Sequence, residues 1–286
     1  MNNFAVFILT YGRANKVTTY KTLKKAGYTG EIYLVCSTDD KSLEDYKKLY
    51  GDKVLVFNKE DYEGKFDIGD NFKEKKVVVY ARNAIYNIVE RTGNKYFLVL
   101  DDDYTCFNYR FKNNLEYDEK AGKIRRNLDK IFERILEYYK KIPAKSIALA
   151  QGGDFIGGKY GDLAQNIKTK RKIMNSFFCS TERRFQFIGR INEDVNTYVR
   201  LGNKGELVFQ TNQLGIEQET TQENEGGLTE FYLDTGTYIK SFYTIIFAPS
   251  CTKIRLMGNK DMRLHHFIKW NKTAPKIVRE NIKLNK

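Results

Sequence analysis

Three adjacent carboxylates, Asp101, Asp102 and Asp103, are the residues of this sequence best suited to chemistry. They follow an apolar and aromatic run at 96–100, which predicts a buried strand because no polar residue interrupts it. In open α/β sheets, ligands bind at the carboxyl ends of strands. Neighbouring acids repel one another unless a cation neutralises them, and their hard oxygens suit Mg²⁺ or Mn²⁺. The alternative interpretation is a solvated acidic turn that only closes the strand.

The elements before this triplet alternate between strands and helices. Apolar runs predict strands at 4–9, 32–36 and 54–57. Helical patterns are expected at about 15–26 and 41–50, and a third helix should end at about Glu90. The order β-α-β-α-β predicts a parallel, doubly wound α/β sheet. The polar, glycine-containing segment 59–76 is expected to be a loop.

Four polar motifs stand at the ends of these elements. They are, in order, Thr10-Tyr11-Gly12-Arg13, Ser37-Thr38-Asp39-Asp40, Ala81-Arg82-Asn83 and Leu100-Asp101-Asp102-Asp103. In these motifs and their order, the first hundred residues resemble the GT-A fold nucleotide-sugar glycosyltransferases of the family-2 type, in which the last motif is the DXD motif. One departure is Gly12, where that family usually has Asn.

The resemblance implies a fold and a donor site. The fold is α/β, a GT-A (Rossmann-like), mostly parallel sheet flanked by helices, in a single domain over residues 1–286 with additions on the acceptor side. Residues 1–110 would bind the nucleotide sugar, expected to be UDP-glucose or UDP-N-acetylglucosamine, and 111–286 would hold the acceptor and a C-terminal tail. The residues implied to bind the donor are Thr10, Tyr11, Arg13, Asp39, Asp40, Arg82, Asn83, Asp101 and Asp102.

The resemblance also implies a divalent metal, Mn²⁺ or Mg²⁺, that stabilises the charge developing on the leaving diphosphate. Asp103 is the expected direct ligand, and Asp101 would touch the ribose or sugar, or reach the metal through water. Some GT-A enzymes add a C-terminal histidine, and the two histidines of this chain are adjacent at His265 and His266. Neutral imidazole is a competent ligand. A purely structural histidine pair is the alternative.

A second acidic pair, Glu193 and Asp194, begins a predicted helix that carries Arg200 and ends near Gly205. GT-A enzymes of this type place such a pair at a helix start, and in inverting members the Asp is the general base that deprotonates the acceptor hydroxyl. A helix N-terminus keeps a carboxylate ionised. We therefore expect Asp194 to be the base and Glu193 to support it. Simple helix capping is the alternative.

The chain of 286 residues has a formal net charge of +13, which is compatible with a polyanionic partner. Its richness in Lys, Asn, Ile and Tyr can also come from an AT-rich coding sequence, so position is better evidence than the total. Basic residues concentrate at 168–190, where phenylalanines are interleaved. This pattern suits nucleic acid, with candidates Lys170, Arg171, Lys172, Arg183 and Arg184. A solvated basic face beside an aromatic core strand explains it equally well.

The second half of the chain gives weaker structural signals. Residues 112–141 have a helical, charged pattern, and 211–230 are expected to form a mobile polar segment. Strands are predicted at 146–150 and 207–210. Four scattered cysteines and the absence of a signal-like or membrane-spanning run predict a cytoplasmic protein with reduced thiols, in the host cytoplasm if the gene is from a phage.

The compact chain, the basic segment and the C-terminal histidines are similar to the phage-type TET-associated glycosyltransferases. That resemblance implies transfer of a sugar to hydroxymethylated pyrimidines, 5-hydroxymethylcytosine or 5-hydroxymethyluracil, in double-stranded DNA. Two alternatives stay open. One is a transferase for a saccharide or protein acceptor, and the other is a nucleic-acid-binding module that has lost catalysis.

Overall fold

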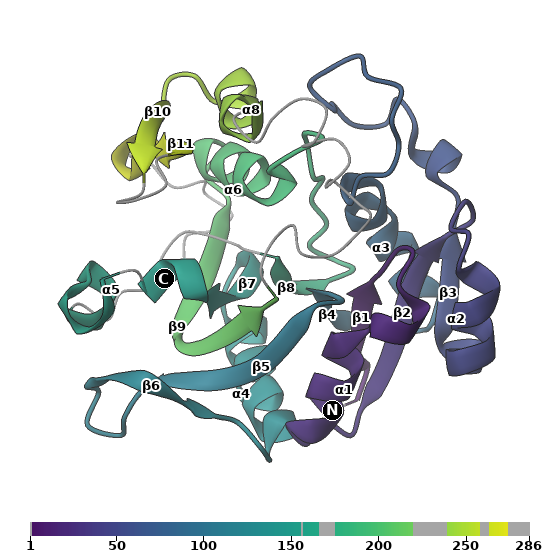
Figure 1. The fold of residues 1–286 in the computed structure, drawn as a ribbon, viewed down its shortest axis with the longest axis horizontal. Coiled ribbons are helices and arrows are strands. Elements are labelled where there is room, and N and C mark those ends of the chain that lie inside the picture. The colour runs from purple at the N-terminus through teal and green to yellow at the C-terminus, as the bar shows by residue number, and fades with distance from the viewer. Residues whose placement is uncertain (1, 156, 166–174, 220–238, 258–262, 274–286) are drawn as a thin grey trace.

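The computed structural model describes residues 2–155, 157–165, 175–219, 239–257 and 263–273 (Figure 1). The strands are β1 (Phe4–Leu9), β2 (Glu31–Ser37), β3 (Val54–Phe57), β4 (Tyr96–Asp101), β5 (Tyr104–Phe111), β6 (Tyr117–Lys123), β7 (Ala144–Gln151), β8 (Ser176–Ser180), β9 (Leu207–Gln218), β10 (Thr252–Met257) and β11 (Arg263–Ile268). The helices are α1 (Thr18–Lys25), α2 (Leu43–Tyr50), α3 (Val79–Arg91), α4 (Leu128–Lys141), α5 (Asp162–Gln165), α6 (Glu193–Asn203) and α8 (Ile239–Phe247).

A nine-stranded sheet, ordered β3-β2-β1-β4-β8-β7-β9-β5-β6, forms the centre of the molecule. Strands β3, β2, β1 and β4 are parallel neighbours, and Leu9 of β1 lies opposite Asp101 of β4. Their carboxyl ends therefore meet at one edge, where the acidic triplet begins. The other half is mixed, since β8 runs antiparallel to β4 and β5 antiparallel to β9, whereas β7 and β9 are parallel. Strands β10 and β11 form a separate hairpin sheet.

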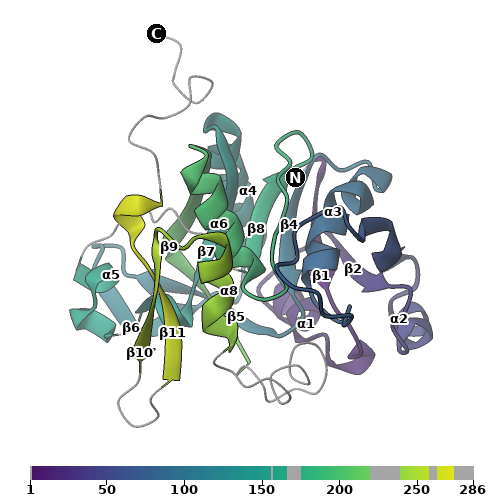
Figure 2. The ribbon, with the colours of Figure 1, turned by 90° about the horizontal axis from the view of Figure 1, so that it is seen from above.

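Apolar side chains cover both faces of this sheet, with helices on each side (Figures 1 and 2). In β1, Ala5, Phe7 and Leu9 pack in one core cluster with residues of α3 and α6, whereas Phe4, Val6 and Ile8 pack in the other with α1, α2 and α4. A strand buried on both faces reads as a continuous apolar run, as β1 does. The expected α/β class with helices flanking the sheet is confirmed.

Two expectations for the second half are wrong. Residues 117–123 belong to β6, an edge strand paired with β5, and only α4 is helical within 112–141. Strand β9 continues to Gln218, so residues 211–218 are strand rather than a mobile segment. The predicted bounds of β1 and β3 are confirmed.

All four cysteines are buried free thiols, as expected. Among the described residues, no helix is long and apolar enough to cross a membrane.

Candidate active site

The N-terminal end of α1 holds the acidic turn in place. The Thr19 hydroxyl donates to the Asp101 carbonyl at 2.6 Å and accepts from the Tyr104 N–H at 2.8 Å. The Thr19 N–H donates to the Asp102 carbonyl at 3.0 Å. With its backbone fixed on both sides, the turn presents its three carboxylates to three different partners, which are Thr10 for Asp102, Arg82 for Asp101 and Gln218 for Asp103.

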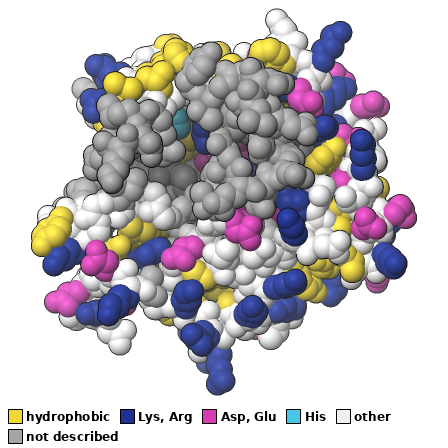
Figure 3. Space-filling view, viewed as in Figure 1, with side chains coloured by type: hydrophobic (Ala, Val, Ile, Leu, Met, Phe, Trp, Pro, Cys, Tyr) yellow, Lys and Arg dark blue, Asp and Glu magenta, His cyan; other side chains and the backbone are white. Residues whose placement is uncertain are grey.

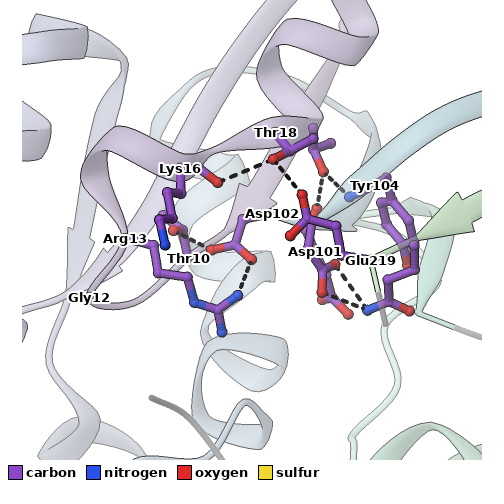
Figure 4. Close-up of polar contacts among 12 residues, drawn as sticks. Thr10, Gly12, Arg13, Lys16, Thr18, Asp101, Asp102, Tyr104 and Glu219 are labelled. Atoms are coloured by element: carbon purple, nitrogen blue, oxygen red, sulfur yellow. Dashed lines mark hydrogen bonds and ion pairs between the residues drawn. The ribbon is translucent and has the colours of Figure 1, made fainter. Parts of the chain in front are cut away.

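Asp102 points away from the other two acids, as its middle position in the triplet predicts. Its carboxylate accepts from Thr10 Oγ1 at 2.7 Å and from Arg13 Nη1 at 3.1 Å (Figure 4). Burial raises the pKa of Asp102 to about 6, although Arg13 and the Thr10 hydrogen bond oppose the shift. Thr10, Arg13 and Asp102 therefore bind one another and fix the loop after β1, instead of all three facing a donor.

Arg82 joins Asp101 to the acidic pair of α6. Its Nη2 donates to Asp101 Oδ1 at 2.6 Å, and its Nε donates to Glu193 Oε1 at 3.4 Å. The guanidinium is 1% exposed and lies over the Phe177 ring, with its Nη1 left without a hydrogen-bond partner among the described residues. This arrangement makes Arg82 a positioning residue between two carboxylates, where the sequence suggested a phosphate-binding one.

Burial and mutual repulsion raise the pKa values of the acids in this cluster. Burial raises the pKa of Asp101 to about 7, with Arg82 opposing and Asp103 and Glu193 adding to the shift. Burial followed by repulsion from Asp194 raises the pKa of Glu193, again against Arg82. Removing carboxylates from water disfavours their charged form. Without a cation, these carboxyl groups therefore favour the protonated form more strongly than exposed acids do.

Asp103 lies on the side of the turn that faces β9. Both of its oxygens accept from Gln218 Nε2, at 2.9 and 3.0 Å, and its carbonyl accepts from the Glu219 N–H at 3.0 Å. The Glu219 carboxylate in turn accepts from Thr18 Oγ1 at 3.0 Å (Figure 4). Burial raises the pKa of Asp103, and the Gln218 hydrogen bonds oppose this. Its expected place at the metal is compatible with a buried carboxylate held by a neutral amide.

The two aspartates of the motif at the end of β2 make different contacts. Asp40 accepts from the Gly12 N–H at 2.9 Å and from the Ser42 N–H at 2.8 Å, so it ties the β1 loop to the start of α2. Asp39 pairs with Lys59 at 2.9 Å, and Lys59 lies over the Tyr11 ring at 4.6 Å. Burial alone would raise the pKa of Asp39, but hydrogen bonds from Ser37 and Lys59 lower it below its usual value. Asp39 and Tyr11 are half exposed at this edge and stay candidates for donor contact.

Asn83 has a structural partner in the loop before α6. Its Nδ2 donates to the Phe187 carbonyl at 3.0 Å, and its Oδ1 accepts from the Phe187 N–H at 2.9 Å. Both ends of the amide therefore bind the backbone of the loop before α6, and donor contact by Asn83 stays a prediction.

Asp194 lies beside Glu193 in the first turn of α6, where the helix dipole favours negative charge. The residue before them, Asn192, donates to the Lys240 carbonyl at 2.6 Å and lies 3.4 Å from His266 Nδ1. The rings of His265 and His266 pack edge to face at 4.5 Å. Across the described part of the chain, no group of three His, Cys, Asp or Glu side chains is placed to hold a metal, so neither histidine joins Asp101 and Asp103 in such a group.

The arginines of the basic segment are placed differently from the expectation. Ser180 pairs with Tyr96 at the amino end of β4, so Arg183 and Arg184 lie at the edge opposite the acidic triplet. Arg183 Nη1 donates to the carbonyls of Tyr139, Ile142 and Ala144, at 2.7–3.1 Å, at the end of α4. Arg184 binds Asn87 and Glu90 of α3. Lys170, Arg171 and Lys172 lie outside the described residues.

Three residues of the site lie outside the motifs identified in the sequence. Thr19 fixes the acidic turn, Lys59 fixes Asp39, and Gln218 fixes Asp103. Lys59 lies two residues after the end of β3, and a lysine near the carboxyl end of a parallel strand is visible in the sequence. Thr19 and Gln218 act through contacts more than 80 residues apart in the chain, which no local pattern reveals.

Comparison with known proteins gives one match to a family and several structural similarities. A search of curated proteins finds no match. Glucosyl-3-phosphoglycerate synthase from Mycobacterium tuberculosis, solved with Mg²⁺ and UDP, superposes with a TM-score of 0.45 and 9% identity, covering 93% of this chain and 87% of that one. TarS of S. aureus gives a TM-score of 0.44 and 10% identity over 77% of this chain and 37% of that one. At such identities these similarities concern the arrangement of the chain alone.

The family match covers residues 4–227, which includes all four motifs of the donor side and the acidic pair of α6. The matching model is that of the TET-Associated Glycosyltransferase family. A match over that much of the sequence confirms the resemblance drawn from the motifs, and this chain therefore belongs to the TET-associated glycosyltransferase family.

Proposed function

We propose that this glycosyltransferase binds a nucleotide-sugar donor at the carboxyl edge of β1, β2 and β4 and transfers the sugar to a hydroxymethyl group on a pyrimidine of DNA. The observation that carries the proposal is that one guanidinium, that of Arg82, binds both Asp101 of the acidic turn and Glu193 of the α6 pair. One set of acids serves the donor, and the other serves the acceptor hydroxyl.

The donor half rests on the exposed groups of this edge. Asp39 and Tyr11 stand where the second strand ends, and nucleosides bind at that position in open α/β sheets. The synthase that resembles this chain was solved with UDP and with UDP-glucose, and TarS with UDP-N-acetylglucosamine. A uridine diphosphate sugar, with glucose or N-acetylglucosamine, is the donor class we propose.

The acids of the turn fit a divalent cation. Asp101 and Asp103 are partly buried and lie two residues apart in one turn, and burial raises the pKa of both. A bound cation would favour their ionised form and offset that cost. Mg²⁺ is usually held by one or two carboxylates together with substrate phosphates, so a three-ligand protein cage is not needed. Asp103 would hold the ion, with Asp101 beside it. A bound Mg²⁺ or Mn²⁺ would supply neutralising charge for the leaving diphosphate.

Asp194 is the proposed general base. Arg82 engages Glu193, so Glu193 is held as a neighbour that orients the start of α6. Asp194 accepts the proton of the acceptor hydroxyl as that oxygen attacks the sugar, and the helix N-terminus stabilises its ionised form before the reaction. Arg82 keeps the two acidic sites at a fixed separation by binding one carboxylate from each.

The DNA acceptor is supported by the family name, because TET-type oxidation yields hydroxymethylated pyrimidines. A base inside a duplex is out of reach, so the enzyme would extrude the target nucleotide. On the face shown in Figure 3, Lys and Arg side chains are spread among acidic ones rather than gathered in a single patch. We do not assign phosphate binding to Arg183 and Arg184, because their hydrogen-bond partners lie within the fold.

The test is release of nucleoside diphosphate from a panel of nucleotide sugars, with Mn²⁺, Mg²⁺ or chelator, in the presence of three acceptors. These are duplex DNA with 5-hydroxymethylcytosine, duplex DNA with 5-hydroxymethyluracil, and the unmodified duplex. We expect metal-dependent release that a modified duplex stimulates. Release stimulated by a simple saccharide but by neither modified duplex would replace the DNA acceptor with a saccharide.

A further inference from the structure

A group of polar side chains on the sheet face beside α6 has no role in the site described above. This amide cluster consists of Asn108 and Arg110 of β5, Gln210 and Asn212 of β9, and Gln151 at the end of β7. Asn108 and Gln210 are 0% exposed, and Asn212 is 2% exposed. Buried amides are unusual in a sheet unless partners satisfy them.

The hydrogen bonds of the cluster leave particular atoms unused. Gln210 Nε2 donates to Asp154 at 2.8 Å and to Asn212 Oδ1 at 3.2 Å, but Gln210 Oε1 has no hydrogen-bond partner in the described structure. Asn108 Nδ2 donates to Glu217 at 2.9 Å, and Asn108 Oδ1 likewise has none among the described residues. A buried carbonyl without a donor is destabilising, which is a reason to expect a ligand group there.

Arg110 adds an N–H group without a hydrogen-bond partner among the described residues, and a planar guanidinium. Its Nη2 donates to Glu217 at 3.1 Å, and its guanidinium lies over the Phe155 ring at 4.8 Å. Its buried Nε has no partner in the part of the chain that the structure describes. Gly215 keeps this place clear, because a Cβ there would lie 2.6 Å from Asn108 Oδ1 and 3.2 Å from Arg110 Nε.

The cluster begins next to the reacting groups. Gln151 Nε2 donates at 3.2 Å to the hydroxyl of Tyr104, the residue that follows Asp103, and Gln218, three residues after Gly215, binds Asp103. Asn108 lies five residues beyond Asp103 along β5, about 16 Å at roughly 3.3 Å per residue. Strand β5 therefore leads directly from the metal-binding acid to the cluster.

From this geometry we infer that the amide cluster is the acceptor-reading site and that it binds the hydrogen-bonding edge of the extruded pyrimidine. The inference rests on the proposed DNA-base acceptor. Two carbonyl oxygens would accept from the exocyclic amine of cytosine or the ring N–H of uracil, and the arginine would donate to a base oxygen or nitrogen. Base readout pairs amide and guanidinium groups with base edges in this way. Because the oxygens are buried in the free chain, binding requires a local opening above the sheet.

The test compares Gln210→Met with Gln213→Ala. The methionine keeps most of the volume and removes the unsatisfied carbonyl, and Gln213 is an exposed residue of the same strand that serves as the control. We expect the KM for a 5-hydroxymethylcytosine duplex to rise roughly tenfold or more in Gln210→Met, with donor hydrolysis and donor KM unchanged. Gln213→Ala should match the wild type. Asn108→Ala, on the neighbouring strand, repeats the test if Gln210→Met does not fold.

The outcomes separate this inference from the proposed function. If the wild type modifies the duplex and both cluster variants keep the wild-type acceptor KM, the inference is overturned and the proposed function stands. If the wild type hydrolyses donor but modifies only a methyl glycoside or another saccharide, both are overturned. A raised acceptor KM in both variants, with unchanged donor hydrolysis, establishes the amide cluster as the acceptor-reading site.

Discussion

At the scale of single residues, the three aspartates after β4 have different surroundings and therefore different roles. Asp102 is held by Thr10 and Arg13 and belongs to the scaffold of the β1 loop. Asp101 is paired with Arg82, and Asp103 is held by the neutral amide of Gln218. The sequence predicts this division for Asp102, because alternate residues at a strand end point in opposite directions.

Asp103→Asn should abolish metal-dependent donor turnover while the fold survives. The change removes the charge of the expected ligand but keeps a side chain that Gln218 can bind. We expect a loss on the order of 100-fold or more in turnover of a labelled nucleotide sugar. Thermal unfolding without metal should be unchanged or improved, since a buried acid is removed. Full activity in this variant, or in wild type treated with chelator, would contradict the role of the metal.

The raised pKa of Asp101 predicts how metal-free stability changes with pH. Between about 4 and about 7, the unfolded chain ionises this carboxyl while the folded chain keeps it protonated. The stability that Asp101 contributes is therefore fully present at low pH and falls as the pH rises through that window. Urea unfolding of wild type and Asp101→Asn in chelator gives the difference. The difference in free energy of unfolding between the two proteins should decline from pH 4 to pH 7 and then level off. A difference that does not change with pH would show that the pKa of Asp101 is not raised.

The arginines explain where reasoning from sequence fails at this scale. The charges of Arg183 and Arg184 suggested phosphate binding, but Arg183 donates to backbone carbonyls and Arg184 binds Asn87 and Glu90 of α3. A guanidinium has five donors, and whether they meet protein or phosphate depends on tertiary contacts. Composition therefore predicted a basic segment and could not predict its orientation.

At the scale of elements, buried arginines attach loops to helices. Arg190 is 1% exposed and binds Asp70 with its Nε at 2.7 and 3.0 Å and Phe72 O with its Nη2 at 2.8 Å. The hydroxyl of Tyr243, in α8, also donates to Asp70. Burial alone would raise the pKa of Asp70, but the bonds from Arg190 and Tyr243 lower it. The segment 67–74 is thereby joined to the start of α6 and to α8.

Arg190→Met should destabilise the chain by about 3–5 kcal/mol, because it leaves Asp70 buried without its cation. The double variant Arg190→Met/Asp70→Leu removes both charges and should recover a large part of that loss. Denaturant unfolding of the wild type, both single variants and the double variant closes the cycle. A loss in the double variant equal to the sum of the two single losses would show that the pair is not coupled.

Arg183 belongs to the end of α4. Arg183→Ala should lower stability by roughly 1.5–3 kcal/mol, because three carbonyls lose a charged donor. Its DNA affinity should equal that of wild type, measured by salt-dependent binding to a duplex. Weakened DNA binding with unchanged stability would return Arg183 to the nucleic-acid surface.

The strands that sequence reasoning missed share a cause. Strand β6 carries several charged residues, and such residues favour an edge position over any local strand signal. Strand β9 contains Asn212, Gln213 and Gly215, which read as a turn, yet β5 and β7 pair with it on both sides. Strand propensity depends strongly on neighbours. In contrast, β1 and β3 are apolar runs, and this local pattern is enough to predict both strands.

At the scale of the whole molecule, the sheet joins a parallel half that ends in the acidic turn to a mixed half that carries the amide cluster. Strand β9 connects them, because Gln218 binds Asp103 and Gln210 belongs to the cluster. The family assignment, the four motifs, most of β7 and the start of β9 were predictable from sequence, and the rest of the second half of the sheet was not. The structure therefore adds most to the sequence in this mixed half, where the amide cluster lies.

The central claim is sugar transfer to a hydroxymethylated pyrimidine in DNA, and mass spectrometry of the digested acceptor tests it most directly. The chain is incubated with UDP-glucose or UDP-N-acetylglucosamine, Mn²⁺ and a duplex containing 5-hydroxymethylcytosine or 5-hydroxymethyluracil, beside the unmodified duplex. Asp194→Asn is the matched control, because it keeps the donor site and lacks the base. We predict a glycosylated nucleoside from at least one modified duplex, none from the unmodified duplex, and none with Asp194→Asn. Absence of any glycosylated nucleoside from both modified duplexes, in a preparation that hydrolyses the donor, would contradict the account.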